Sequence, residues 1–216
     1  MYSEGYVYHI KDEYFKLAGD DKLMQNKENG QYRPTYFCIK DNSTSLLWVV
    51  PMSTRYEKYQ QIAEKQSTKY GKSLGIVLGE YDGKRAVFLV QNMFPITEKY
   101  LDHIHTRNGN PVPVKHSLQE TIKSHVQKAR LLLSKGKNVV FPNVLRLEKL
   151  MIDEIQSSLS HSESYNDLSK NIRVEQALPK TTVPPFSRAS QKDFAETAKK
   201  TPIQQNDKNK DDLDIK

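Results

Sequence analysis

The sequence predicts an α+β protein in which helices pack on a small, strongly curved antiparallel sheet or barrel, with a polar tail behind. Short β-branched and aromatic runs separated by turn residues predict the sheet. Longer segments with apolar residues at every third or fourth position predict helices. Large apolar side chains become rare towards the C-terminus, so this part cannot bury enough surface to offset its ordering entropy. We therefore expect a folded part over residues 1–158 and a disordered tail over residues 159–216.

The strands are expected early in the chain. The sequence Tyr81-Asp82-Gly83-Lys84 between two apolar runs predicts a hairpin, because Asp-Gly favours a tight two-residue turn. Other turn signals, such as Asn29-Gly30 and Asp41-Asn42, separate the remaining runs. Met93–Ile96 would add one more short strand. The other expected strands are Tyr6–Ile10, Tyr36–Lys40, Leu46–Pro51, Leu74–Leu78 and Ala86–Val90.

Three helices are expected between and after the strands, over Arg55–Tyr70, Lys115–Lys135 and Asn143–Leu159. The second has the clearest pattern of apolar residues, and such stripes are typical of core-facing helix surfaces. Asn143 is a suitable N-cap for the third. Within the tail, a transient helix is expected only over residues 191–200.

The charge distribution favours an anionic partner. The chain of 216 residues has a formal net charge of +7, a pI of about 9.2 and a mean hydropathy of −0.73. Residues 159–216 hold 10 Lys and Arg against 9 Asp and Glu, which leaves 23 against 17 in the folded part. The excess positive charge therefore belongs to the folded part, where a basic face would suit nucleic acid. A soluble basic protein without a nucleic-acid role remains the alternative.

Several classes of site and location are not expected. Cys38 is the only cysteine, so we expect neither a disulfide within the chain nor a cysteine zinc cluster. The sequence lacks glycine-rich phosphate loops, the H-E-x-x-H motif and the G-x-S-x-G turn. His103 and His105 are not expected to hold a metal ion. We expect no metal and no cofactor. A signal peptide and a long apolar span are also missing, so we expect a cytoplasmic protein.

The most informative segments are Tyr32–Thr35 and Val50–Arg55, where cations and hydroxyls stand at the ends of two apolar strands. This combination suits a phosphodiester. Cleavage of RNA without a metal uses the ribose 2′-OH as the nucleophile, and the protein stabilises the charge that develops on phosphorus. Candidate residues for this task are Arg33, Thr35, Ser53, Thr54 and Arg55. Ser53 or Thr54 could instead cap the following helix, and both roles can coexist because a helix N-terminus attracts phosphate.

Lysines on the first expected helix are candidates for binding RNA phosphates. Lys58, Lys65, Lys69 and Lys72 follow one another along this stretch. Lys40 lies close in sequence to the candidate site. A solvated helix face is the alternative interpretation of such a run. His9 is a further candidate, for proton transfer.

Four segments resemble the type III toxin–antitoxin endoribonucleases, the ToxN/AbiQ group with its CptN and TenpN branches. They are Val7–Tyr14, Tyr32–Pro34, Val50–Thr54 and Asn92–Ile96, and the resemblance extends over about residues 6–155. It implies a strongly twisted antiparallel barrel like that of the Kid/MazF toxins. It also implies metal-independent RNA cleavage, a role in phage defence, and inhibition by a small repeated RNA that the toxin itself processes. Toxin and RNA would form a closed hetero-oligomer.

The resemblance assigns roles to individual residues. Thr54 stands in the place of the family's key serine, and Tyr14 matches an active-site tyrosine that positions the nucleotide. Thr35 departs from the family, because some members have a lysine directly after this proline, and Arg33 and Lys40 are the available substitutes. The polar tail also exceeds the usual family length. With these assignments, Ser53 and Thr54 hold the scissile phosphate, while Arg33 and Arg55 stabilise the developing charge.

Two other function classes stay open on the sequence alone. The first is a non-catalytic nucleic-acid-binding protein of a mobile element, which would use the same basic face. The second is a Kid/MazF-like toxin controlled by a protein antitoxin, whose groove would receive an acidic peptide. A tandem-repeat array encoded upstream would favour the RNA-controlled toxin, and a small acidic reading frame beside the gene would favour the protein-controlled one.

Overall fold

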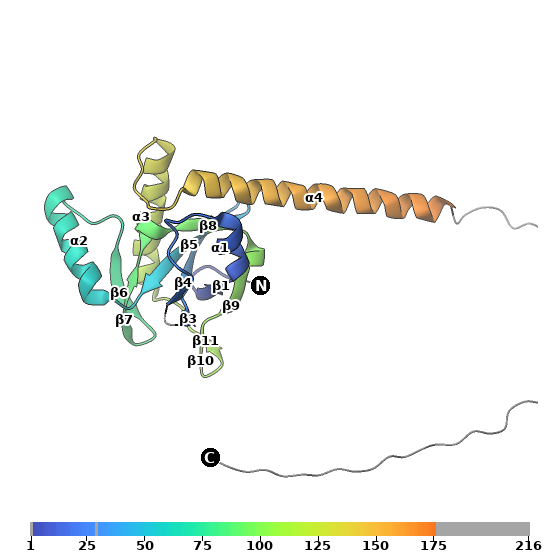
Figure 1. Ribbon diagram of the computed structural model, residues 1–216. Coiled ribbons are helices and arrows are strands. Elements are labelled where there is room, and N and C mark those ends of the chain that lie inside the picture. The colour runs from blue at the N-terminus through green and yellow to red at the C-terminus, as the bar shows by residue number, and fades with distance from the viewer. Residues whose placement is uncertain (1, 29, 176–216) are drawn as a thin grey trace, which may run out of the picture. The chain divides into compact units, whose positions relative to one another are not determined.

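Strand β5 (Leu46–Ser53) organises the sheet, and all of its residues are buried. One edge of β5 pairs with β4 (Thr35–Asp41) along its length. The other edge pairs first with β8 (Phe94–Ile96) and then, at Met52 and Ser53, with β7 (Lys84–Phe88). Because the same edge of β5 pairs with two strands in succession, β5 joins two parts of the antiparallel sheet (Figure 1).

The computed structural model describes residues 2–28 and 30–175, and Met1–Arg173 form one compact unit. The remaining strands are β1 (Val7–Ile10), β2 (Lys27–Glu28), β3 (Gln31–Tyr32), β6 (Val77–Tyr81), β9 (Leu101–Ile104), β10 (Thr106–Arg107) and β11 (Asn110–Pro111). The helices are α1 (Asp12–Ala18), α2 (Tyr56–Tyr70), α3 (His116–Ser134) and α4 (Val144–Glu175), with short 3₁₀ turns at Val90–Asn92 and Glu98–Tyr100.

The α+β class is confirmed, whereas a closed barrel is not. The strand order is β6-β7-β5-β4-β1-β9, with β8 beside β5, and the end strands β6 and β9 do not pair with each other in the described part of the chain. A barrel buries apolar surface around one interior. In this protein, helices cover both faces of the sheet, so apolar residues are buried on each face without closure of the sheet into a barrel.

The alternation of side chains along β5 divides the core into two layers. Trp48, Val50 and Met52 pack in the cluster that contains the α3 residues. Leu47 and Val49 point the other way, into the cluster formed with α1 and α4. Because both faces are covered, β5 is a continuous apolar run rather than an alternating one.

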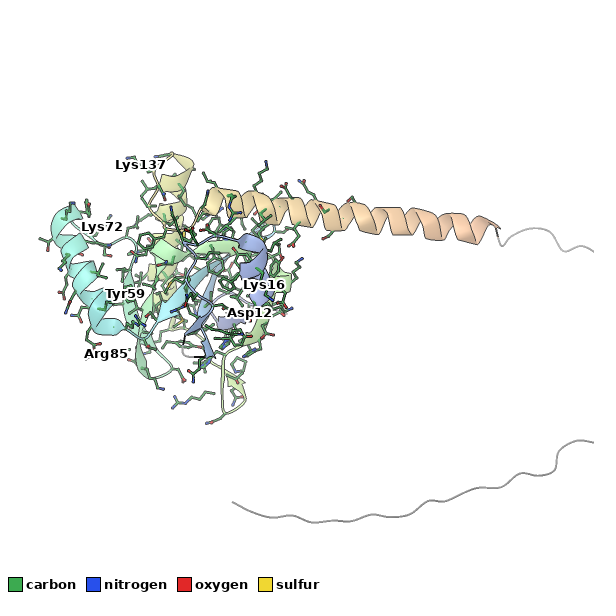
Figure 2. All side chains as sticks on the ribbon, viewed as in Figure 1. Asp12, Lys16, Tyr59, Lys72, Arg85 and Lys137 are labelled. Atoms are coloured by element: carbon green, nitrogen blue, oxygen red, sulfur yellow. The ribbon has the colours of Figure 1, made fainter. Side chains whose placement is uncertain are left out.

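Two helices make specific polar contacts with the sheet. On α3, the guanidinium of Arg130 lies 4.5 Å from the Trp48 ring centroid and pairs with the carboxylate of Asp41. Hydrogen bonds from Ser43 and the Arg130 guanidinium lower the pKa of Asp41 to about 2. Helix α2 packs on β7, and Arg85 pairs with Glu57 of its first turn at 3.3 Å (Figure 2).

The expected strands Leu74–Leu78 and Ala86–Val90 overlap the observed β6 and β7, but both observed strands are shifted by two or three residues towards the turn between them. Asp82 and Gly83 both have positive φ, 51° and 73°, so the turn occupies only these two residues. Both strands therefore continue up to the turn, with Tyr81 paired to Lys84. Cys38 is buried, and burial raises the pKa of its thiol to about 12.

Helix α4 continues to Glu175, beyond the end at Leu159 that was expected for this helix. The cause is visible in the sequence, where no glycine or proline occurs between Val144 and Pro179 to end the helix. Residues 176–216, including the helix expected over residues 191–200, lie outside the described part. None of the described helices is long and apolar enough to cross a membrane.

Candidate functional site

Three neighbouring strands bring the candidate residues to one edge of the sheet. Thr35 at the start of β4 pairs with Pro51 near the end of β5, and the Met52 amide donates to the Pro34 carbonyl at 2.9 Å. On the other side of β4, Tyr8 of β1 pairs with Thr35. The start of β4 therefore lies between the ends of β1 and β5, and α2 begins directly after β5.

A cavity of about 300 Å³ opens at this edge. Four of the residues predicted to act on a phosphodiester line this cavity, namely Arg33, Ser53, Thr54 and Arg55. The pairing of β4 with β5 brings the Tyr-Arg-Pro segment and the Ser-Thr-Arg segment together from opposite directions. The full lining comprises Gln31, Tyr32, Arg33, Pro34, Met52, Ser53, Thr54 and Arg55.

Carbonyl oxygens orient the guanidinium of Arg33. Its Nε donates to the Gln25 carbonyl at 3.0 Å, and its Nη1 donates to the Met52 carbonyl at 3.2 Å. Its backbone amide donates to the Asn26 carbonyl at 2.6 Å. These bonds hold a half-buried cation in one position at the cavity wall. A guanidinium held in this way can present a fixed geometry to a phosphate.

The hydroxyl residues differ in their exposure. Ser53 is only 7% exposed, and its Oγ accepts the Arg55 amide at 3.2 Å. This bond orders the residue before α2, but the alternative role as a helix cap is not confirmed, because Arg55 is the N-cap and no side chain of the described residues forms a capping hydrogen bond there. The side chains of Thr54 and Arg55 are exposed. The partial positive charge of the α2 N-terminus lies beside the same cavity and favours an anion there.

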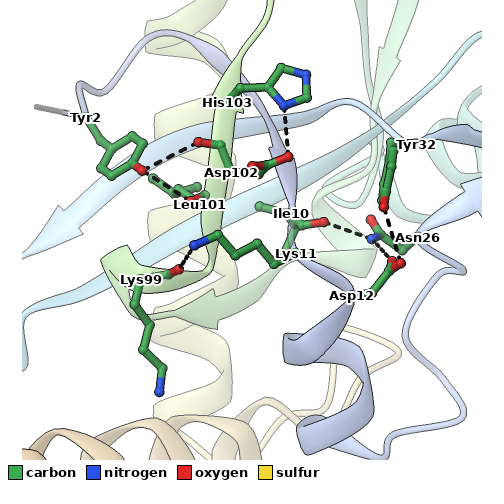
Figure 3. Close-up of polar contacts among 10 residues, drawn as sticks. All are labelled: Tyr2, Ile10, Lys11, Asp12, Asn26, Tyr32, Lys99, Leu101, Asp102 and His103. Carbon is green, nitrogen blue, oxygen red and sulfur yellow. Dashed lines mark hydrogen bonds and ion pairs between the residues drawn. The ribbon is translucent and has the colours of Figure 1, made fainter. Parts of the chain in front are cut away.

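Tyr32 links the cavity to a charged network on α1 and β2. Its hydroxyl donates to Asp12 at 3.3 Å, and the Lys27 ammonium lies 4.3 Å from its ring centroid. Lys27 also bonds Asp12 at 2.6 Å, which raises the pKa of Lys27 to about 12 and lowers that of Asp12. Asn26 bridges the Ile10 carbonyl and Asp12 (Figure 3). The sequence reasoning missed Lys27, although the Asn29-Gly30 turn was a signal for the hairpin that pairs it with Tyr32.

Tyr14 is not in the cavity. Its side chain is fully buried, stacks on Phe94 at a centroid distance of 5.1 Å, and donates its hydroxyl to the Pro95 carbonyl at 3.0 Å. Burial raises the pKa of the Tyr14 phenol far above its usual value. This placement makes Tyr14 a core residue, so we leave it out of the proposed site.

Thr35 and Lys40 are also separated from the cavity. Thr35 is 3% exposed, and its Oγ1 faces the Arg33 carbonyl at 3.5 Å. A lysine in place of Thr35 would therefore have its Cα and the base of its side chain in the protein interior. Lys40 is exposed at the opposite end of β4, about 17 Å from Thr35 at the usual rise per strand residue. Neither residue contacts the cavity within the described chain.

The lysines of α2 form an exposed ridge that begins near the cavity. At 100° of rotation per residue, Lys58, Lys65 and Lys69 lie within a sector of about 40° around the helix axis, and therefore on one face of α2. The ridge extends for about 17 Å at the usual helical rise. Lys72 follows the end of the helix (Figure 2). Lys58, Lys65 and Lys69 therefore share one helix face, Lys72 lies beyond the helix, and the contact of all four with RNA stays a prediction.

His9 lies beside the cavity on β1 and belongs to a group of aromatic rings. It stacks on His103 of β9 at 4.4 Å with an interplanar angle of 12°, and its edge-on contact with Tyr32 has a centroid distance of 5.9 Å. Burial, followed by the nearby His103 and His105, lowers the pKa of His9. Its Nδ1 is buried and has no hydrogen-bond partner in the described residues. No group of three or more His, Cys, Asp or Glu side chains in residues 2–28 and 30–175 is arranged to hold a metal ion.

Comparison with known proteins places this geometry in a known fold. No protein-family model and no curated protein matches the sequence. Among solved structures, the chain is similar to AbiQ with a TM-score of 0.51 and 14% sequence identity, and the alignment covers 74% of this chain and 99% of AbiQ. At this identity the similarity concerns the fold. The chain thus shares the fold of AbiQ, a lactococcal anti-phage endoribonuclease belonging to the type-III toxin–antitoxin system.

Proposed function

We propose that the protein is a metal-independent endoribonuclease toxin of a type III toxin–antitoxin system. The observation that carries the proposal is the cavity at the ends of β4 and β5, where Arg33, Arg55 and two hydroxyl residues converge beside the N-terminus of α2. The AbiQ-like fold supports it, because AbiQ is described as an endoribonuclease of this kind of system. A cavity rich in cations and hydroxyls suits a phosphodiester better than an apolar ligand.

In the proposed reaction, the ribose 2′-OH attacks the adjacent phosphorus and the 5′-oxygen leaves. The products are a 2′,3′-cyclic phosphate and a 5′-hydroxyl end. Negative charge grows on the non-bridging phosphate oxygens, where Arg33 and Arg55 donate hydrogen bonds together with Ser53 and Thr54. A preorganised donor of this kind contributes about 10²–10³ to the rate. DNA lacks the 2′-OH and would not react.

The α2 ridge would extend the contact with RNA beyond the reacting phosphate. Lys58, Lys65 and Lys69 share one exposed face, and neutralisation of RNA phosphates by such lysines releases counterions and favours binding. This contribution is independent of sequence. The ridge would therefore add affinity, and selection of the cleavage site would depend on contacts nearer the cavity.

The partner in this proposal is a repeated RNA that inhibits the toxin in the cytoplasm. Substrate and inhibitor are then the same kind of polymer, and the same cavity and ridge can hold either. The expected assembly is a closed hetero-oligomer of toxin and RNA. It would be detected as a discrete species when the purified protein and the repeat RNA are analysed by light scattering after size exclusion.

Cleavage of RNA by the purified full-length chain tests the function. Oligonucleotides are incubated with and without chelator, and the ends of the products are identified. We expect 2′,3′-cyclic phosphate ends, no effect of chelator, and no cleavage where the attacking 2′-OH is replaced by hydrogen. Cleavage of DNA, or of RNA lacking that hydroxyl, would contradict the proposal. RNA binding without any cleavage would favour the non-catalytic binding protein instead.

Matched variants locate the activity. Arg33→Gln and Thr54→Ala should each reduce the cleavage rate by about 100-fold or more. The controls are Arg107→Gln, an exposed arginine paired with Asp82 at 3.0 Å, and Thr121→Ala, an exposed threonine of α3. Both controls should cleave at the wild-type rate. Wild-type cleavage rates in both site variants would show that the cavity is not the active site.

A further inference from the structure

The proposed cleavage needs a group that accepts the proton of the 2′-OH, and the cavity lining does not supply one. The residues that line it include no His, Asp, Glu, Cys or Lys. Carboxylates and imidazoles are the usual general bases, and histidine is the one best suited to neutral pH. The question is therefore which titratable group next to the cavity could reach a phosphodiester held there.

The sheet register places His9 next to the cavity wall. Tyr8 pairs with Thr35, so the following residue of β1 lies next to Pro34, which lines the cavity. Val7 and Met52 share one core cluster, and alternation along β1 puts His9 on the same face as Val7. With neighbouring strands about 4.8 Å apart, the His9 backbone is one strand from Pro34 and about 10 Å from Met52.

We propose that His9 is the general base of the cleavage reaction, an inference that rests on the proposed function. The imidazole takes the proton of the 2′-OH as the 2′-oxygen forms a bond to phosphorus. The bond between phosphorus and the 5′-oxygen then breaks, and the leaving 5′-oxygen takes a proton from water. The imidazolium finally releases its proton to solvent. No oxidation or reduction occurs, and atoms and charge balance.

The surroundings of His9 suit this role. Nδ1 is buried and has no hydrogen-bond partner among the described residues, so Nε2 is the nitrogen assigned to accept the proton. Its lowered pKa keeps the ring neutral, and therefore basic, at pH 7. Neutral Nε2 is the form a general base requires, whereas a general acid would need the scarce protonated form. The titratable and charged groups around the ring are Asp102, His103 and His105 on the β9 side, Tyr32 with Lys27 and Asp12 on the β3 side, and Arg33 beyond β4.

The other histidines with described side chains fit less well. His125 on α3 is held through Nδ1 by the Leu74 carbonyl at 3.0 Å, and His116 is exposed at the start of the same helix. His103 stacks on His9 and is not among the residues that line the cavity, and its Nδ1 is paired with Asp102 at 2.8 Å (Figure 3). His105 faces Asp82 at 3.6 Å on a different hairpin.

The test is the pH dependence of the single-turnover cleavage rate for wild type, His9→Gln and the control His116→Gln. In wild type the rate should rise with pH along a limb whose midpoint lies below 6.5, because the neutral imidazole is the active form. His9→Gln should lower the rate at pH 7 by about 100-fold or more and remove this limb, with RNA binding unchanged. His116→Gln should keep both rate and limb. Cleavage by His9→Gln within threefold of wild type, with the same limb, would overturn the proposal.

A second variant decides the matter even if His9→Gln does not fold. His103→Gln removes one of the neighbours that lower the pKa of His9. The acidic limb should therefore move to higher pH, with the plateau rate retained. An unmoved limb in a folded His103→Gln protein would contradict the assignment, because a structural role for His9 does not predict this coupling.

The outcomes separate this inference from the function on which it rests. If wild type does not cleave RNA, the proposed function fails. If wild type cleaves and Arg33→Gln abolishes cleavage, while His9→Gln leaves the rate and its limb intact, only the assignment of His9 fails.

Discussion

Replacement of Tyr14 by phenylalanine separates a structural tyrosine from a catalytic one. The resemblance to type III toxins assigns Tyr14 to the active site, whereas the structure buries it against Phe94 with its hydroxyl bonded to the Pro95 carbonyl at 3.0 Å. Tyr14→Phe removes only the hydroxyl and keeps the stacked ring. We therefore expect a loss of stability and no loss of catalytic rate.

The magnitude follows from the buried hydrogen bond. A buried carbonyl left without its donor costs about 1–3 kcal/mol. For a domain of about 150–250 residues, each kcal/mol lowers Tm by roughly 2–4 °C. Tyr14→Phe should thus lower Tm by roughly 2–12 °C. Tyr14→Ala also deletes the ring and leaves a cavity, so it should cost more, about 3–5 kcal/mol.

Thermal unfolding and single-turnover cleavage of the same preparations provide the assay. Cleavage is measured well below the Tm of the variant, so that all molecules are folded. Tyr14→Phe should cleave within threefold of wild type. Unchanged Tm combined with a more than tenfold loss of cleavage would refute the reasoning, because it would mean that the hydroxyl acts on substrate rather than on the core.

Two further predictions concern charge. The double variant Lys65→Ser, Lys69→Ser should weaken RNA binding and reduce the magnitude of the slope of log affinity against log salt by about 1.4, since each phosphate contact to a single strand contributes about 0.7. Filter binding from 50 to 300 mM salt measures this slope. The control pair Lys135→Ser with Lys137→Ser should leave the slope unchanged. The pKa of Asp41 falls from 3.8 to about 2 on folding, so its contribution to stability is complete above about pH 4 and is lost as pH falls towards 2. Urea unfolding should therefore show Asp41→Asn less stable than wild type at pH 7, with the difference vanishing near pH 2; a constant difference would contradict this assignment.

Local sequence patterns were sufficient for the elements that carry the site. The aromatic and β-branched runs of β4 and β5 predicted both strands, and the apolar spacing of α3 predicted that helix to within a residue at each end. The antiparallel pairing of β4 with β5 then brings Arg33 to Ser53 and Thr54. Because these residues stand at strand ends, their grouping at one sheet edge followed from the strand assignment alone.

Contacts between elements that are far apart in the sequence could not be predicted from local patterns. The contact of Tyr14 with Phe94 joins α1 to β8, and the stack of His9 on His103 depends on an irregular register between β1 and β9. Nothing local indicates either contact. The open sheet likewise depends on how both faces are covered by helices. Lys27 was missed for another reason, since a strand of two residues has too little periodicity to identify.

The most direct test of the central claim is to map RNA ends after induced expression of wild type and of Thr54→Ala. Thr54 is exposed in the cavity, so its replacement should not disturb the core. The account predicts growth arrest and new RNA ends carrying 2′,3′-cyclic phosphate with wild type, and neither with Thr54→Ala at equal protein levels. New RNA ends of the same kind and number with Thr54→Ala, or intact RNA with wild type, would contradict it.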